Sequence, residues 1–468
     1  DPELAKDVIV VPGIKIPFAH AGEYAFGVGL DENTIREMEA YNPNCVHFTV
    51  PDFVALDGIR WCQRNNIAYI GTWHSNYIEY LKYYFIEWIL GPAFHRYLKG
   101  FFEQIPTVYV PTSYMLRKMR EEWGYGSATE LKEWGRGVDM NMFSPDRRSA
   151  QFRASKGFTD QDVVVLWVSR LVPEKRPDIW MQCVKRLQEE GLPVKALVVG
   201  NGTFEKYLSK LKYVSCCGWL SGNALGEAYA SSDILLFPSD VETFGNVTLE
   251  ALSSGCPSVV EKKCGDHLVE HGVNGLTCAS GDFESFYQAT RTLVLDPQLR
   301  ARMGKKAREG AWKFERNIIL QQMAENYKDA IEKHRDPTFL KRHMENPEGR
   351  GCNMLSVFCC NYYFIKIIAE PFLNTSKGVQ DLVDGTNDCV QMSRSRLSCS
   401  HLDRDSDSVA DTKDKYIKEK KAKRFSWASL TANCFSPGNC TRTFHLIALL
   451  FAVGVIFLFI YMSLTVRR

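Results

Sequence analysis

Between residue 45 and about residue 330 the sequence repeats one pattern, in which a short apolar run is followed by a turn and an amphipathic stretch. Short runs rich in β-branched residues that alternate with helical stretches of about ten to fifteen residues are typical of parallel βαβ units. The pattern predicts a helix over residues 53–65 and strands over residues 45–49, 67–71, 108–111, 163–168, 195–199, 234–237 and 258–260. The predicted fold class is therefore α/β.

A polar stretch over residues 143–148, which contains Pro145 and two arginines, separates these strands into two sets. Such a stretch is typical of an interdomain linker. We therefore expect two doubly wound, Rossmann-like domains that face one cleft, the first over residues 1–145 and the second over residues 146–333. Ligands of such folds bind outside the carboxyl ends of the strands, so the site residues are expected there.

The last part of the chain differs in character. Residues 334–443 lose the strand periodicity and are rich in Ser, Asp and Lys, which predicts a mostly disordered linker. Residues 444–466 carry no formal charge and are long enough to cross a bilayer, so we predict a single-pass transmembrane anchor, with a buried core helix as the alternative. Residues 413–424 hold seven basic and two acidic side chains, which favours a cytosol-facing body unless the run is merely solvated. The interrupted apolar stretch 355–373 is a candidate interfacial helix.

Charge and cysteine usage exclude several classes of protein. The chain has 57 basic and 55 acidic side chains, so it lacks the basic excess of a dedicated nucleic-acid binder. Its 15 cysteines show no CxxC spacing and mostly lie in apolar runs, which indicates reduced core residues. Asp160 and Asp162 have the DxD spacing of a metal site, but they precede the predicted strand 163–168 and so lie at the wrong end for a ligand. No metal site is predicted.

The most informative segment begins where the predicted strand 234–237 ends. Glu242 precedes a predicted helix and Glu250 lies two turns inside it, eight positions later. The residues between them, from Thr243 to Asn246, can present free backbone N–H groups at the helix N-terminus, where an anionic or hydroxylated ligand binds readily. Gly245 permits close approach of the backbone to such a ligand.

This segment resembles the E-x7-E signature of the retaining glycosyltransferases of family 4, also called glycosyl transferases group 1, which have the GT-B fold. Residues 167–175 resemble the family's GRL-x-x-EK element, with Ser169 where glycine is usual. Residues 198–202 resemble its G-x-G turn, residues 217–220 its base-pocket segment, and residues 134–145 its interdomain hinge. The resemblance covers about residues 45–330, and among family members the sequence looks similar to sulfolipid synthases (sulfoquinovosyltransferases) and glycolipid α-mannosyltransferases.

The resemblance implies a role for each matching residue. Arg170 and Lys175, just past a strand end, are suited to neutralise the donor diphosphate. The resemblance places Glu242 on the donor sugar and His74, which follows the strand 67–71, near the anomeric carbon; His74, Arg170, Lys175 and Glu242 are therefore the candidate catalytic residues. The candidate donor-binding residues are Gly200, Gly202, Trp219, Leu220, Thr243, Phe244, Gly245, Asn246 and Glu250, the last on the ribose hydroxyls.

The predicted function is glycolipid biosynthesis by a retaining, metal-independent hexosyltransferase (EC 2.4.1.-). Its donor is expected to be a UDP- or GDP-linked sugar, its acceptor a lipid or membrane-associated group, and no cofactor is needed. The alternative is a non-catalytic, membrane-tethered protein that binds nucleotide sugars. Family members begin with a strand and a Gly-rich loop, and nothing before Val8 resembles them, so the N-terminal domain is expected to be incomplete.

Overall fold

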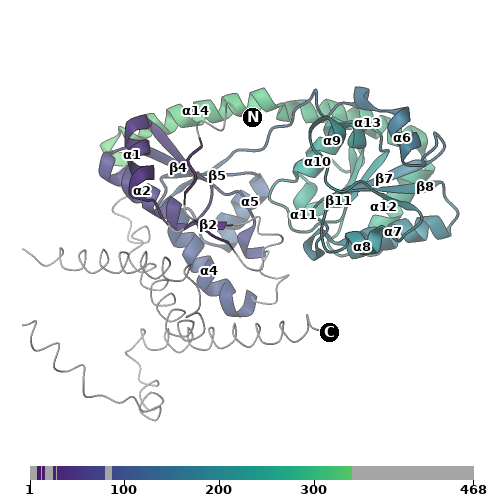
Figure 1. Ribbon diagram of the computed structural model, residues 1–468, viewed down its shortest axis with the longest axis horizontal. Helices are drawn as coiled ribbons and strands as arrows, with labels where there is room; N and C mark the ends of the chain where they lie inside the picture. Colours follow the sequence, from purple (N-terminus) through teal and green to yellow (C-terminus); the bar gives the residue numbers. More distant parts are fainter. Residues whose placement is uncertain (1–7, 12, 16–24, 28, 80–86, 340–468) are drawn as a thin grey trace, which may run out of the picture. The chain divides into compact units, whose positions relative to one another are not determined.

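The structure is a computed structural model that describes residues 8–11, 13–15, 25–27, 29–79 and 87–339 (Figure 1). These residues form two parallel β-sheets surrounded by helices, and a short antiparallel pair made by β1 (Gly13–Lys15) and β2 (Ala25–Gly27). The predicted α/β class with two parallel sheets is confirmed. The predicted double winding is found in the six-stranded sheet, whereas the described strands of the four-stranded sheet follow one another in chain order.

The first parallel sheet has four strands in the order β3-β4-β5-β6. Its strands are β3 (Cys45–Phe48), β4 (Ala68–Thr72), β5 (Thr107–Val110) and β6 (Glu130–Glu133), and the helices between and before them are α1 (Glu32–Tyr41), α2 (Phe53–Asn65), α4 (Glu87–Phe102) and α5 (Ser113–Arg117). The carboxylate of Asp52 caps α2 by accepting the backbone N–H of Ala55 at 2.9 Å. Because consecutive strands are parallel neighbours, their carboxyl ends meet at one edge of the sheet.

The loop that leads into β6 is held by one buried carboxylate. Glu103, which is 0% exposed, accepts four successive backbone N–H groups, from Gly126 at 2.7 Å, Ser127 at 3.3 Å, Ala128 at 2.6 Å and Thr129 at 3.1 Å. Buried backbone N–H groups require acceptors, and Glu103 supplies them where no strand or helix does. The start of β6, and therefore the segment that follows it, is fixed in this way.

The second parallel sheet has six strands in the order β12-β11-β10-β7-β8-β9. They are β7 (Val163–Val168), β8 (Val194–Val199), β9 (Val214–Cys216), β10 (Ile234–Phe237), β11 (Ser258–Glu261) and β12 (Gly275–Cys278). Every residue of β7 and β10 is buried, as expected for central strands covered on both faces. The order of the strands reverses between β7 and β10, and ligands of doubly wound sheets bind at such a switch point.

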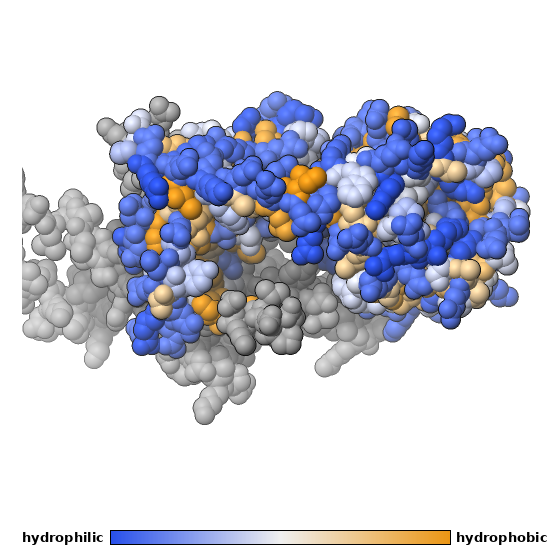
Figure 2. All heavy atoms as spheres, turned by 90° about the horizontal axis from the view of Figure 1, so that it is seen from above, coloured by the Kyte–Doolittle hydropathy of each residue, from blue (hydrophilic) through white to orange (hydrophobic). Residues whose placement is uncertain are grey.

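Helices cover both faces of the six-stranded sheet (Figure 1). They are α6 (Ala150–Ser155), α7 (Pro177–Glu189), α8 (Glu205–Leu208), α9 (Gly222–Ala230), α10 (Asn246–Ser253), α11 (Lys262–Gly265), α12 (Phe283–Leu295) and α13 (Pro297–Ala311). Their apolar stripes join the strands in one core, in which the stacked rings of Trp167 and Trp180 lie 5.3 Å apart. Hydrophilic residues dominate the face shown in Figure 2, because the helices turn their polar sides to solvent.

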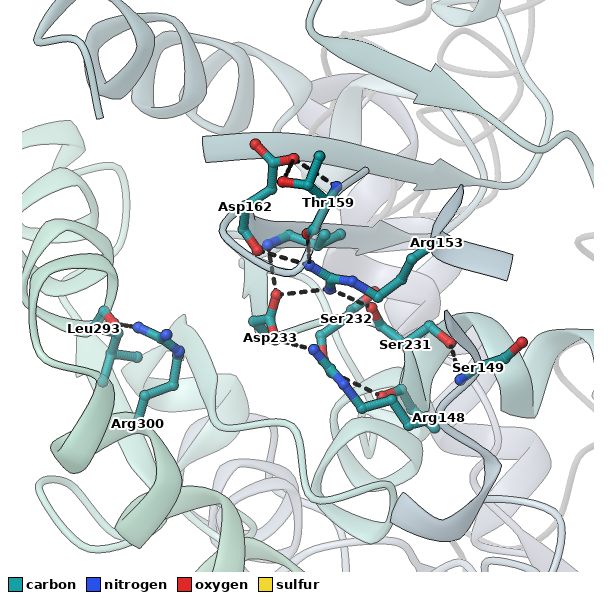
Figure 3. A network of polar contacts seen from close by, with 12 residues as sticks. Arg148, Ser149, Arg153, Thr159, Asp162, Ser231, Ser232, Asp233, Leu293 and Arg300 are labelled. Carbon is teal, nitrogen blue, oxygen red and sulfur yellow. Dashed lines mark hydrogen bonds and ion pairs between the residues drawn. The ribbon is translucent and has the colours of Figure 1, made fainter. Parts of the chain in front are cut away.

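The residues labelled in Figure 3 include an ionic cluster around Asp233. The cluster lies at the amino ends of β7 and β10, because Asp233 directly precedes β10 and bonds to Val164 of β7. The carboxylate of Asp233 pairs with Arg153 at 3.0 Å and with Arg148 at 2.8 Å, and it accepts the backbone N–H of Val164 at 2.7 Å. The side chain of Arg153 is 3% exposed and also donates to the carbonyl oxygens of Thr159, Asp162 and Ser231. The cluster therefore fastens α6 and the loop after it to the sheet.

The last helix, α14 (Arg316–His334), returns to the four-stranded sheet (Figure 1). Its Met323 and Ala330 form a small core with Ile70 of β4 and Tyr109 of β5. Before α14 begins, the backbone of Val138 exchanges hydrogen bonds with Phe314 and Arg316, at 2.8 and 2.9 Å. The chain thus passes twice between the two sheets, through residues 134–139 and through residues 312–316, and the two passages are bonded to each other.

The predicted segments at the C-terminal end lie outside the described residues. This applies to residues 355–373, to the basic run 413–424, to the predicted anchor 444–466, and to all but the first few residues of the predicted linker 334–443. Among the helices that the structure describes, none combines the length and the apolar character needed to cross a membrane.

Candidate functional site

A pocket of about 530 Å³ lies at the carboxyl ends of β7 and β10, at the switch point of the six-stranded sheet. This volume is within the range of about 300–1,000 Å³ that is usual for small-molecule sites. Three residues that line the pocket come from the part of the chain that forms the four-stranded sheet. They are His74 and Ser75, which follow β4, and Arg136, which follows Gly135 in the hinge. The lining residues are His74, Ser75, Arg136, Ser169, Arg170, Lys175, Phe237, Glu242, Thr243, Phe244, Gly245, Asn246 and Val247.

Lys175 and Glu242 form an ion pair inside the pocket. The Lys175 ammonium donates to Oε1 of Glu242, and both side chains are largely buried. The hydroxyl of Ser239 donates to the same oxygen at 2.9 Å. Both contacts use Oε1, so among the described residues Oε2 of Glu242 has no hydrogen-bond partner and remains available to a ligand.

Arg170 follows β7 and is held less tightly than Lys175. One of its guanidinium nitrogens lies 3.5 Å from the carboxylate of Glu174, and 40% of its side chain is exposed. The turn that carries it rests directly on two glycines, because a Cβ at Gly200 would lie 1.9 Å from the carbonyl oxygen of Ser169 and one at Gly202 would lie 2.4 Å from that of Leu171. The predicted G-x-G turn therefore lies behind the pocket wall and sets the position of Arg170.

The N-terminus of α10 opens into the pocket. Gly245 precedes the helix with a φ of 90°, a conformation that other residues rarely adopt, and no side chain of the described residues caps the first N–H groups of the helix. Gly245, Asn246 and Val247 line the pocket. Free N–H groups and the positive end of the helix dipole at this place favour an anionic ligand group.

The remaining predicted donor-binding residues do not line this pocket. Glu250 lies further along α10 and accepts the hydroxyl of Tyr229 at 2.8 Å, and burial raises the pKa of its carboxyl to about 7. Trp219 is 72% exposed on the loop after β9, and the neighbouring Leu220 packs partly on the core. Their predicted contacts to the donor therefore stay predictions, whereas Thr243, Phe244, Gly245 and Asn246 line the pocket.

His74 and Arg136 meet on the other side of the pocket. The Arg136 guanidinium donates to Nδ1 of His74, so the proton of the neutral imidazole is on Nε2. Burial, with a smaller contribution from the Arg136 charge, lowers the pKa of His74 to about 4. At neutral pH His74 is therefore uncharged, and its Nε2–H is a hydrogen-bond donor rather than a proton acceptor.

This arrangement predicts how His74 titrates. Arg136→Gln removes the nearby positive charge, so the pKa of His74 should rise from about 4 but stay below 6.5, because burial is the larger cause. NMR titration of the His74 ring protons measures it. Arg316→Gln, which removes an exposed charge outside the pocket, is the matched control and should leave the His74 pKa unchanged. An unshifted pKa in Arg136→Gln would show that the contact is absent in solution.

The structure brings all four predicted catalytic residues, His74, Arg170, Lys175 and Glu242, to one pocket, together with the predicted Thr243, Phe244, Gly245 and Asn246. Arg136 was not predicted as a site residue; the available signal was its position inside the predicted hinge, three residues after the end of β6. Asp162 precedes β7 and accepts from Thr159 at 2.7 Å, away from the pocket. Among the described residues, no three His, Cys, Asp or Glu side chains are grouped as metal ligands.

Two family models match the chain. The model described as Glycosyltransferase Family 4 matches residues 1–142, and the model described as Glycosyl transferases group 1 matches residues 149–310. Together they cover both parallel sheets and every residue that lines the pocket.

Curated relatives agree with these matches. The sulfoquinovosyl transferase SQD2 of Arabidopsis thaliana is 27% identical over 332 residues, which are 69% of this chain and 64% of the relative. The chain thus spans less than two thirds of the length of that relative. A GDP-mannose-dependent alpha-mannosyltransferase of Corynebacterium glutamicum is 26% identical over 331 residues, 70% of this chain and 77% of the relative.

A solved structure shows the same fold at low sequence identity. The sucrose-phosphate synthase of Thermosynechococcus elongatus superposes with a TM-score of 0.56 at 20% identity, and the match covers 63% of this chain and 75% of that one. The similarity supports the arrangement of two α/β domains.

Proposed function

The chain belongs to the group 1 and family 4 glycosyltransferases, which have the GT-B fold, and on that premise we propose that it is a retaining hexosyltransferase. Its donor is a UDP- or GDP-linked sugar, and its acceptor is a lipid or membrane-proximal group. The names of the relatives support this choice, since one is a sulfoquinovosyl transferase and another depends on GDP-mannose. The product would enter glycolipid biosynthesis.

The observation that carries the proposal is the convergence of positive groups on one pocket. Arg170, Lys175 and the free N–H groups at the start of α10 all line it. A diphosphate needs such groups most when it leaves, because negative charge then develops on it. Lys175 is already held by Glu242, so little reorganisation is required during the reaction.

The proposed reaction exchanges one C–O bond for another. The bond between the anomeric carbon and the diphosphate oxygen breaks, and an acceptor hydroxyl oxygen bonds to that carbon on the same face. The leaving phosphate takes the acceptor proton. Oε2 of Glu242 accepts a hydroxyl of the donor sugar, and the Nε2–H of His74 donates to another sugar oxygen, since His74 is neutral and its Nδ1 is occupied by Arg136.

Hydrolysis of a panel of UDP- and GDP-sugars tests the proposal. We expect one donor to turn over, and transfer to a suitable acceptor should yield the α-linked product from an α-linked donor, read from the anomeric proton by NMR. Turnover should persist in EDTA, because Arg170 and Lys175 supply the positive charge for the diphosphate. Inversion of the anomeric centre, or complete loss in EDTA that manganese restores, would contradict the mechanism. Absence of turnover with every donor would contradict the function.

We further propose that the protein acts at the cytosolic face of a membrane. This proposal rests on the charge-free residues 444–466 and the basic run 413–424, all of which lie outside the described residues. Removal of residues 444–468 should then release the protein into the soluble fraction.

A further inference from the structure

The cations of the pocket are not equally neutralised. Lys175 is paired with Glu242, and Arg170 lies 3.5 Å from the carboxylate of Glu174. Arg136 contacts the imidazole of His74 and lies over the ring of Trp134, with its guanidinium carbon 5.7 Å from the ring centre. Among the described residues no carboxylate pairs with Arg136.

The surroundings of Arg136 preserve this positive charge. Burial lowers the pKa of Arg136 itself, which shows that the guanidinium is partly withdrawn from water without compensation from an acidic group. His74 and the nearby His47 both have pKa values lowered to about 4, so neither shares a positive charge with it at neutral pH. A half-buried cation without a counter-charge is costly, and a ligand that brings a negative charge removes that cost.

The direction in which Arg136 can bind is also fixed. One N–H of its guanidinium is used by His74, and a guanidinium has five N–H donors in a planar fork. Among the described residues, no second acceptor is hydrogen-bonded to the Arg136 guanidinium. Such a fork binds the two oxygens of a phosphate, sulfonate or carboxylate group side by side.

Arg136 is separate from the cations assigned to the diphosphate. Arg170 and Lys175 follow β7, whereas Arg136 comes from the hinge after β6, where a Cβ on the preceding Gly135 would lie 3.2 Å from the ring of Phe244. It therefore enters the pocket beside His74, on the side that the sugar and the acceptor would occupy if the proposed function holds.

We infer that Arg136 binds an oxyanion of the substrate other than the donor diphosphate, carried either by the transferred sugar or by the acceptor. This inference rests on the proposed function for the identity of the substrate, and on the unpaired guanidinium for the chemistry. The enzyme would accordingly prefer an anionic substrate to its neutral counterpart.

The first experiment does not depend on turnover. Inorganic phosphate is titrated into the full chain while the His74 ring resonances are followed by NMR. We expect a saturable shift in the wild type and in the control Arg316→Gln, and about 10–100-fold weaker binding in Arg136→Gln, as a charged hydrogen-bonded contact is lost. Arg136→Lys, which keeps the charge but not the fork, should recover part of the affinity. The absence of a saturable shift, or equal binding in Arg136→Gln, would overturn the inference.

The second experiment identifies the source of the oxyanion. The wild type is compared on UDP-glucose and UDP-glucuronate as donors, and on vesicles with diacylglycerol or phosphatidylinositol as acceptors. We expect the wild type to prefer the anionic member of one pair, and this preference should fall about 10–100-fold in Arg136→Gln. If the donor pair is affected, the oxyanion belongs to the sugar. If the acceptor pair is affected, it belongs to the acceptor. Turnover with no preference in either pair would overturn the inference while the proposed function stands. Lack of turnover would instead reject the proposed function, and the phosphate titration would then decide on Arg136 alone.

Discussion

Replacement of Lys175 by alanine should lower turnover of the nucleotide sugar by about 10²–10³-fold, the usual effect of losing one preorganised contact to developing charge. Lys175 lines the pocket and is held there by Glu242. Glu242→Ala should cause a loss of similar size, because it removes the group that positions Lys175 and, with it, the proposed contact to the donor sugar. Steady-state hydrolysis rates at saturating donor measure the effect.

The control for this pair is Lys185→Ala on α7, which removes an exposed lysine whose side chain is 65% accessible. It should retain the wild-type rate. The double variant Lys175→Ala/Glu242→Ala should lose less than the product of the two single losses, because the residues act as one unit. Near-normal rates in both single variants would remove Lys175 and Glu242 from the mechanism.

Asp233→Asn should destabilise the six-stranded domain by about 3–5 kcal/mol, the usual cost of removing one partner of a buried ion pair. The substitution leaves the guanidinium of Arg153, whose side chain is 3% exposed, without its carboxylate, although the amide oxygen can still accept the N–H of Val164. Urea unfolding followed by tryptophan fluorescence measures the loss, since Trp167 and Trp180 lie in the same core.

Asp160→Asn provides a control of the same chemistry on the exposed loop before β7. A surface change of this kind should alter the free energy of unfolding by no more than about 0.5 kcal/mol. If Asp233→Asn were as mild as Asp160→Asn, the ionic cluster of Figure 3 would contribute little to stability.

The sequence predicted the bounds of an element correctly where the element is buried on both faces or has a regular apolar stripe. The strands 163–168 and 234–237 and the helix 53–65 have the predicted bounds, because β7 and β10 are covered on both faces and α2 has a regular apolar stripe. The polar strand β6 (Glu130–Glu133) was not predicted, since it lies at a sheet edge and alternates poorly. β9 and β12 were missed because three or four residues with partial burial give no clear period.

Residues of the candidate site could be predicted where a side chain with suitable chemistry follows a predicted strand. His74, Arg170, Lys175 and Glu242 all follow predicted strands, and the parallel topology brings them to one pocket. Arg136 was missed because its partner His74 is 62 positions away, and only the neighbouring order of β4, β5 and β6 brings the two segments together. The charge balance of the pocket depends on such contacts between distant segments, so it could not be derived from local sequence.

The return of α14 to the four-stranded sheet has a consequence for how this chain acquires its fold on the ribosome. β4 and β5 lack part of their core until Met323 and Ala330 have been made, although β6 already ends at Glu133. Translation proceeds at about 5–20 residues per second, so the first sheet waits on the order of ten seconds or more for its last helix. During that interval the face that carries Ile70 and Tyr109 lacks its cover, and the six-stranded domain, whose strands are contiguous in the chain, can complete its core first. The N-terminal half is therefore synthesised first and finished last, which makes it the part of the nascent protein with the greater need of a chaperone.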